Sequence, residues 1–239
     1  MKTEGRNAVK ELLKTQKNID KMLMEKGAQG SLSVLFAQAR QKNIRVQFVE
    51  RQVLDKESET GRHQGVIAYT TDYEYFDLED IIQNKKSEKG GFIVLCDGIE
   101  DVHNLGSIIR VCECAGVDGV VIPKTASASV TESVIRISAG AAEHMKVAKV
   151  SNLNNAVETL KKNGYWTYAL EAGGEDMYAQ DFTGNVALIV GGEDSGVKRL
   201  TKEKCDKVVS IPLKGQVNSL NASVALGIAA YEVVRSRDK

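Results

Sequence analysis

Residues 186–196 read Val186-Ala-Leu-Ile-Val-Gly-Gly-Glu-Asp-Ser-Gly196, a short apolar run followed by a glycine-rich turn. Such a run is typical of a strand that is buried on both faces of a parallel sheet. Comparable apolar runs occur at 92–96, 119–122, 166–170 and 208–211. Helical patterns separate these runs, at 105–115, 131–139, 153–163, 197–203 and 220–235. The alternation predicts an α/β fold with a parallel sheet in the second part of the chain.

The front of the chain predicts a separate, smaller α/β domain. Its helical patterns lie at 6–14 and 32–42, and its strand patterns lie at 19–24, 44–49 and 66–70. An acidic stretch follows, with helical character at 78–82, and it runs into Asn84-Lys-Lys-Ser-Glu-Lys-Gly-Gly91. This composition is typical of a connector. We therefore expect a first domain at 1–71, a linker at 72–90 and a second domain at 91–239.

The distribution of charge supports this division. The 239 residues carry 32 Lys and Arg and 32 Asp and Glu, and a net charge of zero argues against nucleic-acid binding. By segment, however, 1–71 has 13 basic and 8 acidic residues, 72–90 has 3 and 6, and 91–239 has 16 and 18. The net charge is thus +5 for residues 1–71, −3 for the linker and −2 for the remainder. This asymmetry indicates an interaction module joined to a catalytic body; an uneven solvated surface is the alternative.

Several classes of protein are disfavoured by the sequence. No apolar run approaches the roughly 20 residues that span a bilayer, and the first ten residues are polar, so we expect a cytoplasmic protein without membrane contact. The four cysteines are expected to be buried, reduced side chains. Two of them form a Cys112-x-Cys114 pair, which is a poor metal signature, and only three histidines are present. We expect no metal site.

Polar residues follow three of the predicted strands, where ligands of parallel sheets usually bind. After 92–96, Asn104 can cap the following helix, and Arg110 lies among apolar residues, where a guanidinium is costly to bury without an anion. An arginine that reaches the surface is the alternative reading. After 186–190, the glycine-rich turn carries Glu193 and Asp194, which would repel a pyrophosphate. This turn suits a cationic ligand such as S-adenosylmethionine, or it is an ordinary tight turn.

The third polar cluster precedes the last helical pattern. Asn218, Ser219 and Asn221 crowd its first residues, and one of them suffices as the helix cap, which leaves the others free to bind a ligand. The helix itself is rich in Ala, Ser and Gly. These small side chains allow close packing against neighbouring backbone, with or without a ligand.

The three clusters together resemble motifs 1, 2 and 3 of the SpoU (TrmH) RNA 2′-O-ribose methyltransferases. The matching segments are Asn104-Leu-Gly-Ser-Ile-Ile-Arg110, Gly191-Gly-Glu-Asp-Ser-Gly196 and Ile211-Pro-Leu-Lys-Gly-Gln-Val-Asn-Ser-Leu-Asn-Ala-Ser-Val-Ala225. The front, with Gly5-Arg-Asn-Ala-Val9 and His63-Gln-Gly65, is similar to the ribosomal-protein-L30e-like substrate-binding domain of the subgroup that methylates guanosine in 23S ribosomal RNA. Asp194 and Val102 depart from the residues common in the family, Gly and Pro.

The resemblance implies a SPOUT-type parallel sheet with a C-terminal trefoil knot, a homodimer and S-adenosylmethionine as the cofactor. It implies catalytic roles for Asn104, Arg110, Glu193, Ser219 and Asn221. It implies that the cofactor is held by Gly191, Gly192, Gly196, Ile211, Leu213 and Leu220. Contacts with ribosomal RNA are implied for Arg6, His63 and Gln64. The expected reaction is methylation of a guanosine 2′-hydroxyl in 23S ribosomal RNA; a transfer RNA guanosine methyltransferase and a non-catalytic RNA-binding or ribosome-assembly protein are the alternatives.

Overall fold

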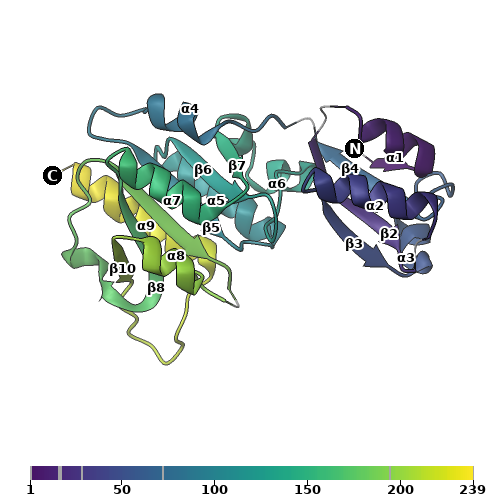
Figure 1. Cartoon of the computed structure of the whole chain (residues 1–239). Coiled ribbons are helices and arrows are strands. Elements are labelled where there is room, and N and C mark those ends of the chain that lie inside the picture. The colour runs from purple at the N-terminus through teal and green to yellow at the C-terminus, as the bar shows by residue number, and fades with distance from the viewer. Residues whose placement is uncertain (1, 16–17, 28, 72, 194, 239) are drawn as a thin grey trace. The chain divides into compact units, whose positions relative to one another are not determined.

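A computed structural model describes residues 2–15, 18–27, 29–71, 73–193 and 195–238. The chain divides into two compact units, Met1–Glu74 and Tyr75–Lys239, and each has its own hydrophobic core (Figure 1). Within the described part of the chain, no helix is long and apolar enough to cross a membrane.

The N-terminal unit is a four-stranded sheet with helices on both faces. Its elements are β1 (Lys2–Glu4), α1 (Arg6–Leu12), β2 (Asn18–Glu25), α2 (Ser31–Gln41), β3 (Arg45–Val49), α3 (Arg51–Glu57) and β4 (Val66–Thr71). The strand order is β1-β4-β2-β3, with β2 and β3 parallel and the other pairs antiparallel. The strands and helices expected from the sequence are present. The patterns missed β1 and α3, which are too short to show a clear periodicity.

Alternation along β2 divides the core of this unit into two layers. Met22 and Met24 face the cluster formed with α1 and α2, whereas Leu23 faces the cluster that contains Leu54 of α3. Successive side chains of a strand point to opposite faces of its sheet, so one short strand supplies both layers.

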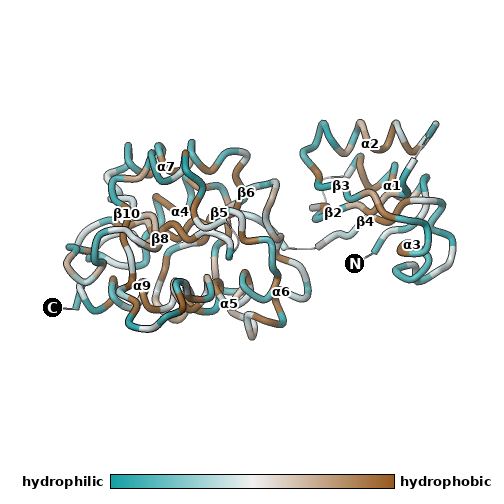
Figure 2. The backbone as a smooth tube through the Cα atoms, turned by 90° about the horizontal axis from the view of Figure 1, so that it is seen from below, coloured by the Kyte–Doolittle hydropathy of each residue, from teal (hydrophilic) through white to brown (hydrophobic). Residues whose placement is uncertain are grey.

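The C-terminal unit is built on a six-stranded parallel sheet, which confirms the predicted fold class. Its helices are α4 (Leu78–Gln83), α5 (Val102–Cys114), α6 (Glu132–Ile137), α7 (Leu153–Lys162), α8 (Arg199–Lys204) and α9 (Ala222–Arg237). Its strands are β5 (Phe92–Asp97), β6 (Gly119–Pro123), β7 (Val147–Val150), β8 (Trp166–Asp176), β9 (Val186–Gly191) and β10 (Lys207–Ser210). The strand order is β10-β8-β9-β5-β6-β7. Figure 2 shows α7 on one side of this sheet and α5, α6 and α9 on the other, and α4 shares a core cluster with α7.

The segment 72–90, expected to be a linker, contributes α4 to the C-terminal unit. Leu78, Ile81 and Ile82 are buried in one core cluster with α7 and the sheet, whereas Glu79 and Asp80 are exposed. The spacing i, i+3, i+4 places the three apolar residues on one helical face. The helical character at 78–82 is confirmed, but the many charges of the segment did not indicate that this helix packs into a core.

The strand order decides which loops meet. All six strands are parallel, so their carboxyl ends lie at one edge of the sheet. β5 and β9 are direct neighbours, and β8 separates β9 from β10. The loops that follow β5, β9 and β10 therefore emerge at the same edge. The trefoil knot stays a prediction.

Candidate active site

Three side chains, one from each of these loops, join in a hydrogen-bonded cluster at the carboxyl edge of the sheet. Asn104 Nδ2 donates to Glu193 Oε1 at 3.1 Å, and Asn221 Nδ2 donates to Asn104 Oδ1 at 2.8 Å. Asn221 Nδ2 also donates to Glu193 Oε1. The cluster thus brings together three of the five residues that the motifs single out as catalytic.

The helix caps explain why these two amides are available. Asn104 was expected to cap α5, but Asp101 is the cap, and its Oδ1 accepts from Asn104 N at 2.8 Å. Asn221 caps α9: its Oδ1 accepts from Ser223 N at 3.0 Å and from Val224 N at 3.3 Å. With its oxygen held by the helix, the amide of Asn221 directs its NH2 group at Glu193.

A cavity of about 390 Å³ opens beside the cluster, within the C-terminal unit. It is lined by all six residues expected to hold the cofactor, Gly191, Gly192, Gly196, Ile211, Leu213 and Leu220. Glu193 and Ser219, two of the expected catalytic residues, line it as well. A cavity of this size falls in the range of about 300–1,000 Å³ that is usual for small-molecule sites.

Glycines make this cavity possible because the backbone folds back on itself. A Cβ atom on Gly191 would overlap the backbone of Gly196. Gly196 has a φ of +59°, and a Cβ atom there would lie 2.5 Å from Glu171 Oε2. A side chain at Gly191 would therefore collide with the backbone of the turn, and one at Gly196 would also have to adopt a left-handed φ. Asp194, which departs from the family at this turn, lies outside the described residues.

The lining is acidic. The carboxylates of Glu171 and Glu193 belong to it, and no lysine or arginine does among the described lining residues. Such a surface disfavours a phosphate-rich ligand and suits one with positive charge. This electrostatic character agrees with the reading of the glycine-rich turn as a poor dinucleotide site.

The structure offers no metal centre among the residues it describes. No group of three or more His, Cys, Asp or Glu side chains in the described ranges is placed to hold a metal ion. Burial raises the pKa of the Cys96 thiol to about 12, so this side chain stays protonated at neutral pH. Cys96 and Cys112 are buried as expected, but Cys114 is exposed and Cys205 is half-buried.

Arg110 lies apart from the cluster. It is exposed on α5, it does not line the cavity, and it makes no hydrogen bond or ion pair with any other described residue. The neighbouring Ile108 and Ile109 are buried, so the helix directs its apolar face inward and leaves the guanidinium in solvent. A single chain therefore does not bring Arg110 to the cavity.

The residues expected to contact RNA lie together in the N-terminal unit, but they differ in exposure. Arg6 Nε donates to Gln64 O at 2.9 Å, and Arg6 Nη1 donates to Ser31 Oγ at 3.1 Å, all on exposed residues. His63 is only 2% exposed. One ring nitrogen contacts Asp55 Oδ1 at 2.9 Å, and the other accepts from Gly65 N at 3.0 Å. The ring of His63 is thus buried against Asp55 and the turn at Gly65, and its contact with RNA stays a prediction.

Two acidic residues at the site escaped the sequence reading. Asp97 and Glu171 accept hydrogen bonds from the backbone at the end of the glycine-rich turn. Each follows a predicted strand directly, at 92–96 and 166–170, so the rule that ligands bind beyond the carboxyl ends of parallel strands could have found both.

Comparisons with known proteins agree with this geometry. The model of the SpoU rRNA Methylase family matches residues 91–231, and that of RNA 2′-O ribose methyltransferase substrate binding matches residues 3–76. A protein of Staphylococcus saprophyticus, named as a TrmH family tRNA/rRNA methyltransferase, is 42% identical over 237 residues, which are 98% of this chain and 95% of that protein. The similarly named YacO of Bacillus subtilis is 41% identical over 238 residues, with the same coverage.

A solved structure shares the fold. The SpoU methyltransferase AviRb from Streptomyces viridochromogenes, crystallised in complex with AdoMet, aligns with a TM-score of 0.63 and 23% identity, over 100% of this chain and 90% of AviRb. The two family models cover both units, and the relatives match along nearly the whole chain. The chain therefore belongs to the SpoU (TrmH) family of RNA 2′-O-ribose methyltransferases.

Proposed function

We propose that this enzyme transfers the methyl group of S-adenosylmethionine to the ribose 2′-hydroxyl of a guanosine in 23S ribosomal RNA, in the cytoplasm. The observation that carries the proposal is the cluster of Asn104, Glu193 and Asn221 beside a glycine-built cavity. Three segments that are distant in the sequence bring these polar side chains together at the carboxyl edge of the sheet. Stability of the fold alone does not require such a cluster.

The residues of the cavity fit S-adenosylmethionine, which supplies a methyl group on a positively charged sulfur. Backbone around Gly191, Ile211 and Leu220, which line the cavity, would hold the adenosyl part. The carboxylates of Glu171 and Glu193 tolerate a cationic ligand. The complex of AviRb with AdoMet supports this choice of cofactor.

The chain's polar residues position the ribose for an in-line transfer. Ser219 and Asn221 hydrogen-bond cofactor and ribose, and Glu193 keeps the amides of Asn104 and Asn221 in place. Much of the acceleration comes from this alignment. A guanidinium has five donors and no acceptor, so Arg110 is a poor base. It orients the target phosphate and stabilises the oxyanion that forms as the 2′-hydroxyl loses its proton to a phosphate oxygen.

A homodimer is part of the proposal. Val224 and Tyr231 of α9 are 51% and 52% exposed, and their spacing of seven residues places them on one face of the helix. An exposed apolar helix face marks an interaction surface. Light scattering at micromolar concentration is expected to give the mass of two chains; the mass of one chain would contradict the proposal.

The decisive experiment gives the purified full chain labelled S-adenosylmethionine with ribosomal RNA and transfer RNA in separate reactions. We expect label in 23S ribosomal RNA, at a guanosine whose 3′ phosphodiester bond resists alkali because its 2′-hydroxyl is methylated. Label in transfer RNA alone would overturn the choice of substrate, and the names of the relatives include both RNAs. Absence of cofactor binding by calorimetry would favour a non-catalytic RNA-binding protein.

A further inference from the structure

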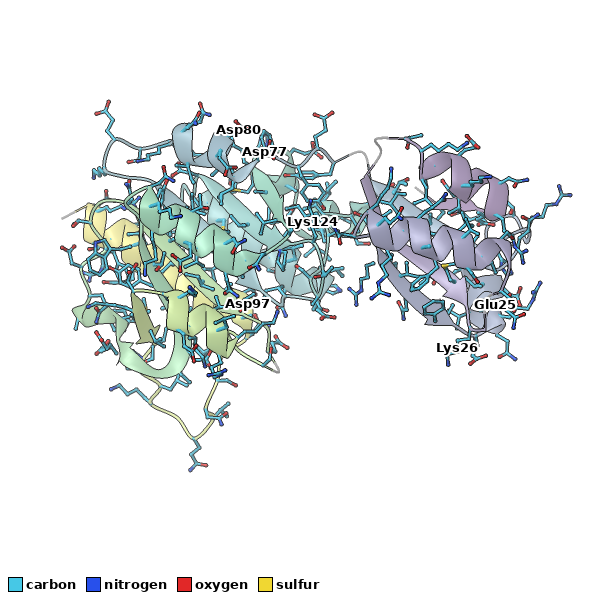
Figure 3. All side chains as sticks on the ribbon, viewed as in Figure 1. Glu25, Lys26, Asp77, Asp80, Asp97 and Lys124 are labelled. Atoms are coloured by element: carbon cyan, nitrogen blue, oxygen red, sulfur yellow. The ribbon has the colours of Figure 1, made fainter. Side chains whose placement is uncertain are left out.

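Asp97 holds both ends of the glycine-rich turn. It is the last residue of β5 and is 2% exposed (Figure 3). Its main-chain oxygen accepts from Gly192 N at 3.1 Å, where the turn begins. Its carboxylate accepts from Lys198 N at 3.0 Å, where the turn ends, and lies 3.1 Å from Lys198 Nζ. Asp97 thus connects β5, the strand before motif 1, to the beginning and the end of the glycine-rich turn of motif 2.

A second carboxylate, that of Glu171, accepts a hydrogen bond from the residue before Lys198. Glu171, from β8, accepts from Val197 N at 2.8 Å, and it lies 3.7 Å from Lys202 Nζ. β5 and β8 flank β9 on its two sides, so the turn that leaves β9 is bonded from both neighbouring strands. Inside the turn, Gly196 N donates to Gly192 O at 2.8 Å. The turn is therefore fixed at its ends and closed across its middle.

The position of this turn decides the shape of the site. It carries Glu193, which receives the amides of Asn104 and Asn221, and its glycines line the cavity. A buried carboxylate is costly unless its oxygens are satisfied, and here one backbone N–H and one ammonium satisfy Asp97. The two ends of the turn are consequently held before any ligand binds, which lowers the cost of ordering it on binding.

We propose that Asp97 is a positioning residue for methyl transfer, whose carboxylate holds the glycine-rich turn in the conformation that binds the cofactor. The proposal rests on the proposed function, in which the cavity holds S-adenosylmethionine. Asp97 is absent from the described residues that line the cavity, so it acts on the cofactor only through the turn. Glu171 lines the cavity itself, so its variants would mix direct and indirect effects.

Asp118 provides a matched control. It is also 2% exposed, and its carboxylate accepts from Lys86 N and from Phe92 N, each at 2.6 Å. Phe92 is the first residue of β5, whereas Asp97 is the last, so the two carboxylates lie at opposite ends of one strand. Replacement of either residue removes a buried carboxylate with backbone partners, but only Asp97 bonds the turn.

The experiment compares Asp97→Ala and Asp118→Ala in the full chain, with S-adenosylmethionine as the probe. We expect Asp97→Ala to weaken the calorimetric Kd about tenfold or more and to raise the KM for the cofactor by a similar factor, because the turn must now be ordered on binding. The KM for RNA should stay within about twofold, since RNA binding depends mainly on the N-terminal unit. Asp118→Ala should lower the thermal unfolding temperature while its cofactor Kd stays within about twofold of wild type.

The outcomes separate the two proposals. A wild-type chain that does not bind S-adenosylmethionine would overturn both the proposed function and the role of Asp97. A wild-type chain that binds it, with an Asp97→Ala variant that binds equally well, would overturn the role of Asp97 alone. An equal loss of affinity in both alanine variants would assign the effect to general destabilisation and would also overturn that role.

Should an alanine variant fail to fold, Asp97→Asn and Asp118→Asn replace the pair. Asparagine keeps the shape of the side chain but loses the charge that faces Lys198 Nζ. We expect Asp97→Asn to bind the cofactor about fivefold more weakly than Asp118→Asn, because only the first carboxylate has an ammonium partner in the turn. Equal affinities would contradict the proposal.

Discussion

Glu193 receives the NH2 groups of two asparagines that come from different loops, and these contacts define the geometry of the site. Asn221 has two roles: its side-chain oxygen caps α9, and its side-chain nitrogen donates to Glu193 and Asn104. Each amide is therefore fixed by groups on both sides. Rigid polar groups of this kind stabilise a transition state without reorganising during the reaction.

Arg110 is expected to matter for turnover and not for cofactor binding, because it is exposed and lies outside the cavity. Arg110→Ala should lower the rate of methyl transfer about 100-fold or more, by loss of the cation that stabilises the oxyanion, with an unchanged Kd for S-adenosylmethionine. Steady-state kinetics and calorimetry measure the two effects. Arg136→Ala, at an exposed arginine of α6, is the control and should retain the activity. Wild-type activity in Arg110→Ala would refute this role.

In α5, one residue of motif 1, Gly106, is required for the packing of helices. Gly106, in motif 1, is buried where α5 contacts α6, and a Cβ atom there would lie 2.6 Å from Ile137 Cγ2 and 3.2 Å from Val134 O. Gly227, in α9, faces α5 with more room: a Cβ atom would lie 3.9 Å from Val111. The two glycines thus look alike in the sequence but differ in what their neighbours allow.

Gly106→Ala is expected to destabilise the protein. Overpacking costs about 1–3 kcal/mol, and the better helix propensity of alanine offsets about 1 kcal/mol of it. Gly227→Ala meets only an ordinary contact distance and should be neutral or stabilising by up to about 1 kcal/mol. Thermal unfolding of both variants tests the contrast. Equal unfolding temperatures would show that α6 moves away from α5 at little cost.

Glu4, the last residue of β1, forms hydrogen bonds with the turn that follows α3. Glu4 accepts from Ser58 Oγ at 2.6 Å, from Glu59 N at 2.6 Å and from Thr60 Oγ1 at 2.7 Å. Desolvation raises the pKa of Glu4, but these hydrogen bonds outweigh it and lower the pKa from 4.5 to about 2. The ionised carboxylate therefore stabilises this short edge strand.

A pH dependence of stability follows from this pKa. Because the pKa of Glu4 is lower in the folded state, its contribution is present above about pH 4.5 and is lost as the pH falls toward 2. Glu4→Gln should therefore lower the stability of the N-terminal unit at pH 6 and make it less sensitive to acid between these values. Urea unfolding at pH 6 and pH 3 measures both effects. Glu50→Gln, at an exposed ion pair with Lys26, is the control and should keep the wild-type dependence.

The molecule as a whole separates charge between its two units. The neutral total combines a basic front with an acidic remainder, and the acidic cavity belongs to the C-terminal unit. Electrostatic attraction of RNA and binding of a cationic cofactor are thereby assigned to different parts of one chain. The absence of net charge is thus compatible with RNA binding.

Removal of the N-terminal unit tests this assignment. A chain of residues 75–239 keeps its own core and should bind S-adenosylmethionine with wild-type affinity. Its affinity for RNA should fall, and the dependence of that affinity on salt should weaken, because fewer phosphate contacts release fewer counterions. RNA titrations at several salt concentrations measure both. Unchanged RNA binding would show that the basic front is only a solvated surface.

Local patterns predicted much of the fold. Five strands of the large sheet appear as apolar runs, and three of them, β5, β6 and β9, are buried along their whole length. β7 was missed, since Lys149 interrupts its short apolar run. α4 was placed in a linker, since its charges hid three buried residues. Short or edge elements owe their structure to tertiary contacts, which propensity alone does not report.

The sequence alone identified the three motifs, the residues around the cavity and the segregation of charge, because each is a property of neighbouring residues. It could not tell that Asn104 meets Asn221 across 117 positions or that Asp97 bonds Lys198 across 101. Those contacts depend on the strand order β10-β8-β9-β5, which long-range pairing decides. Packing within each unit likewise sets exposure: it buries His63 in the N-terminal unit and leaves Arg110 of α5 in solvent, since the environment of a side chain is set by the elements that fold against it.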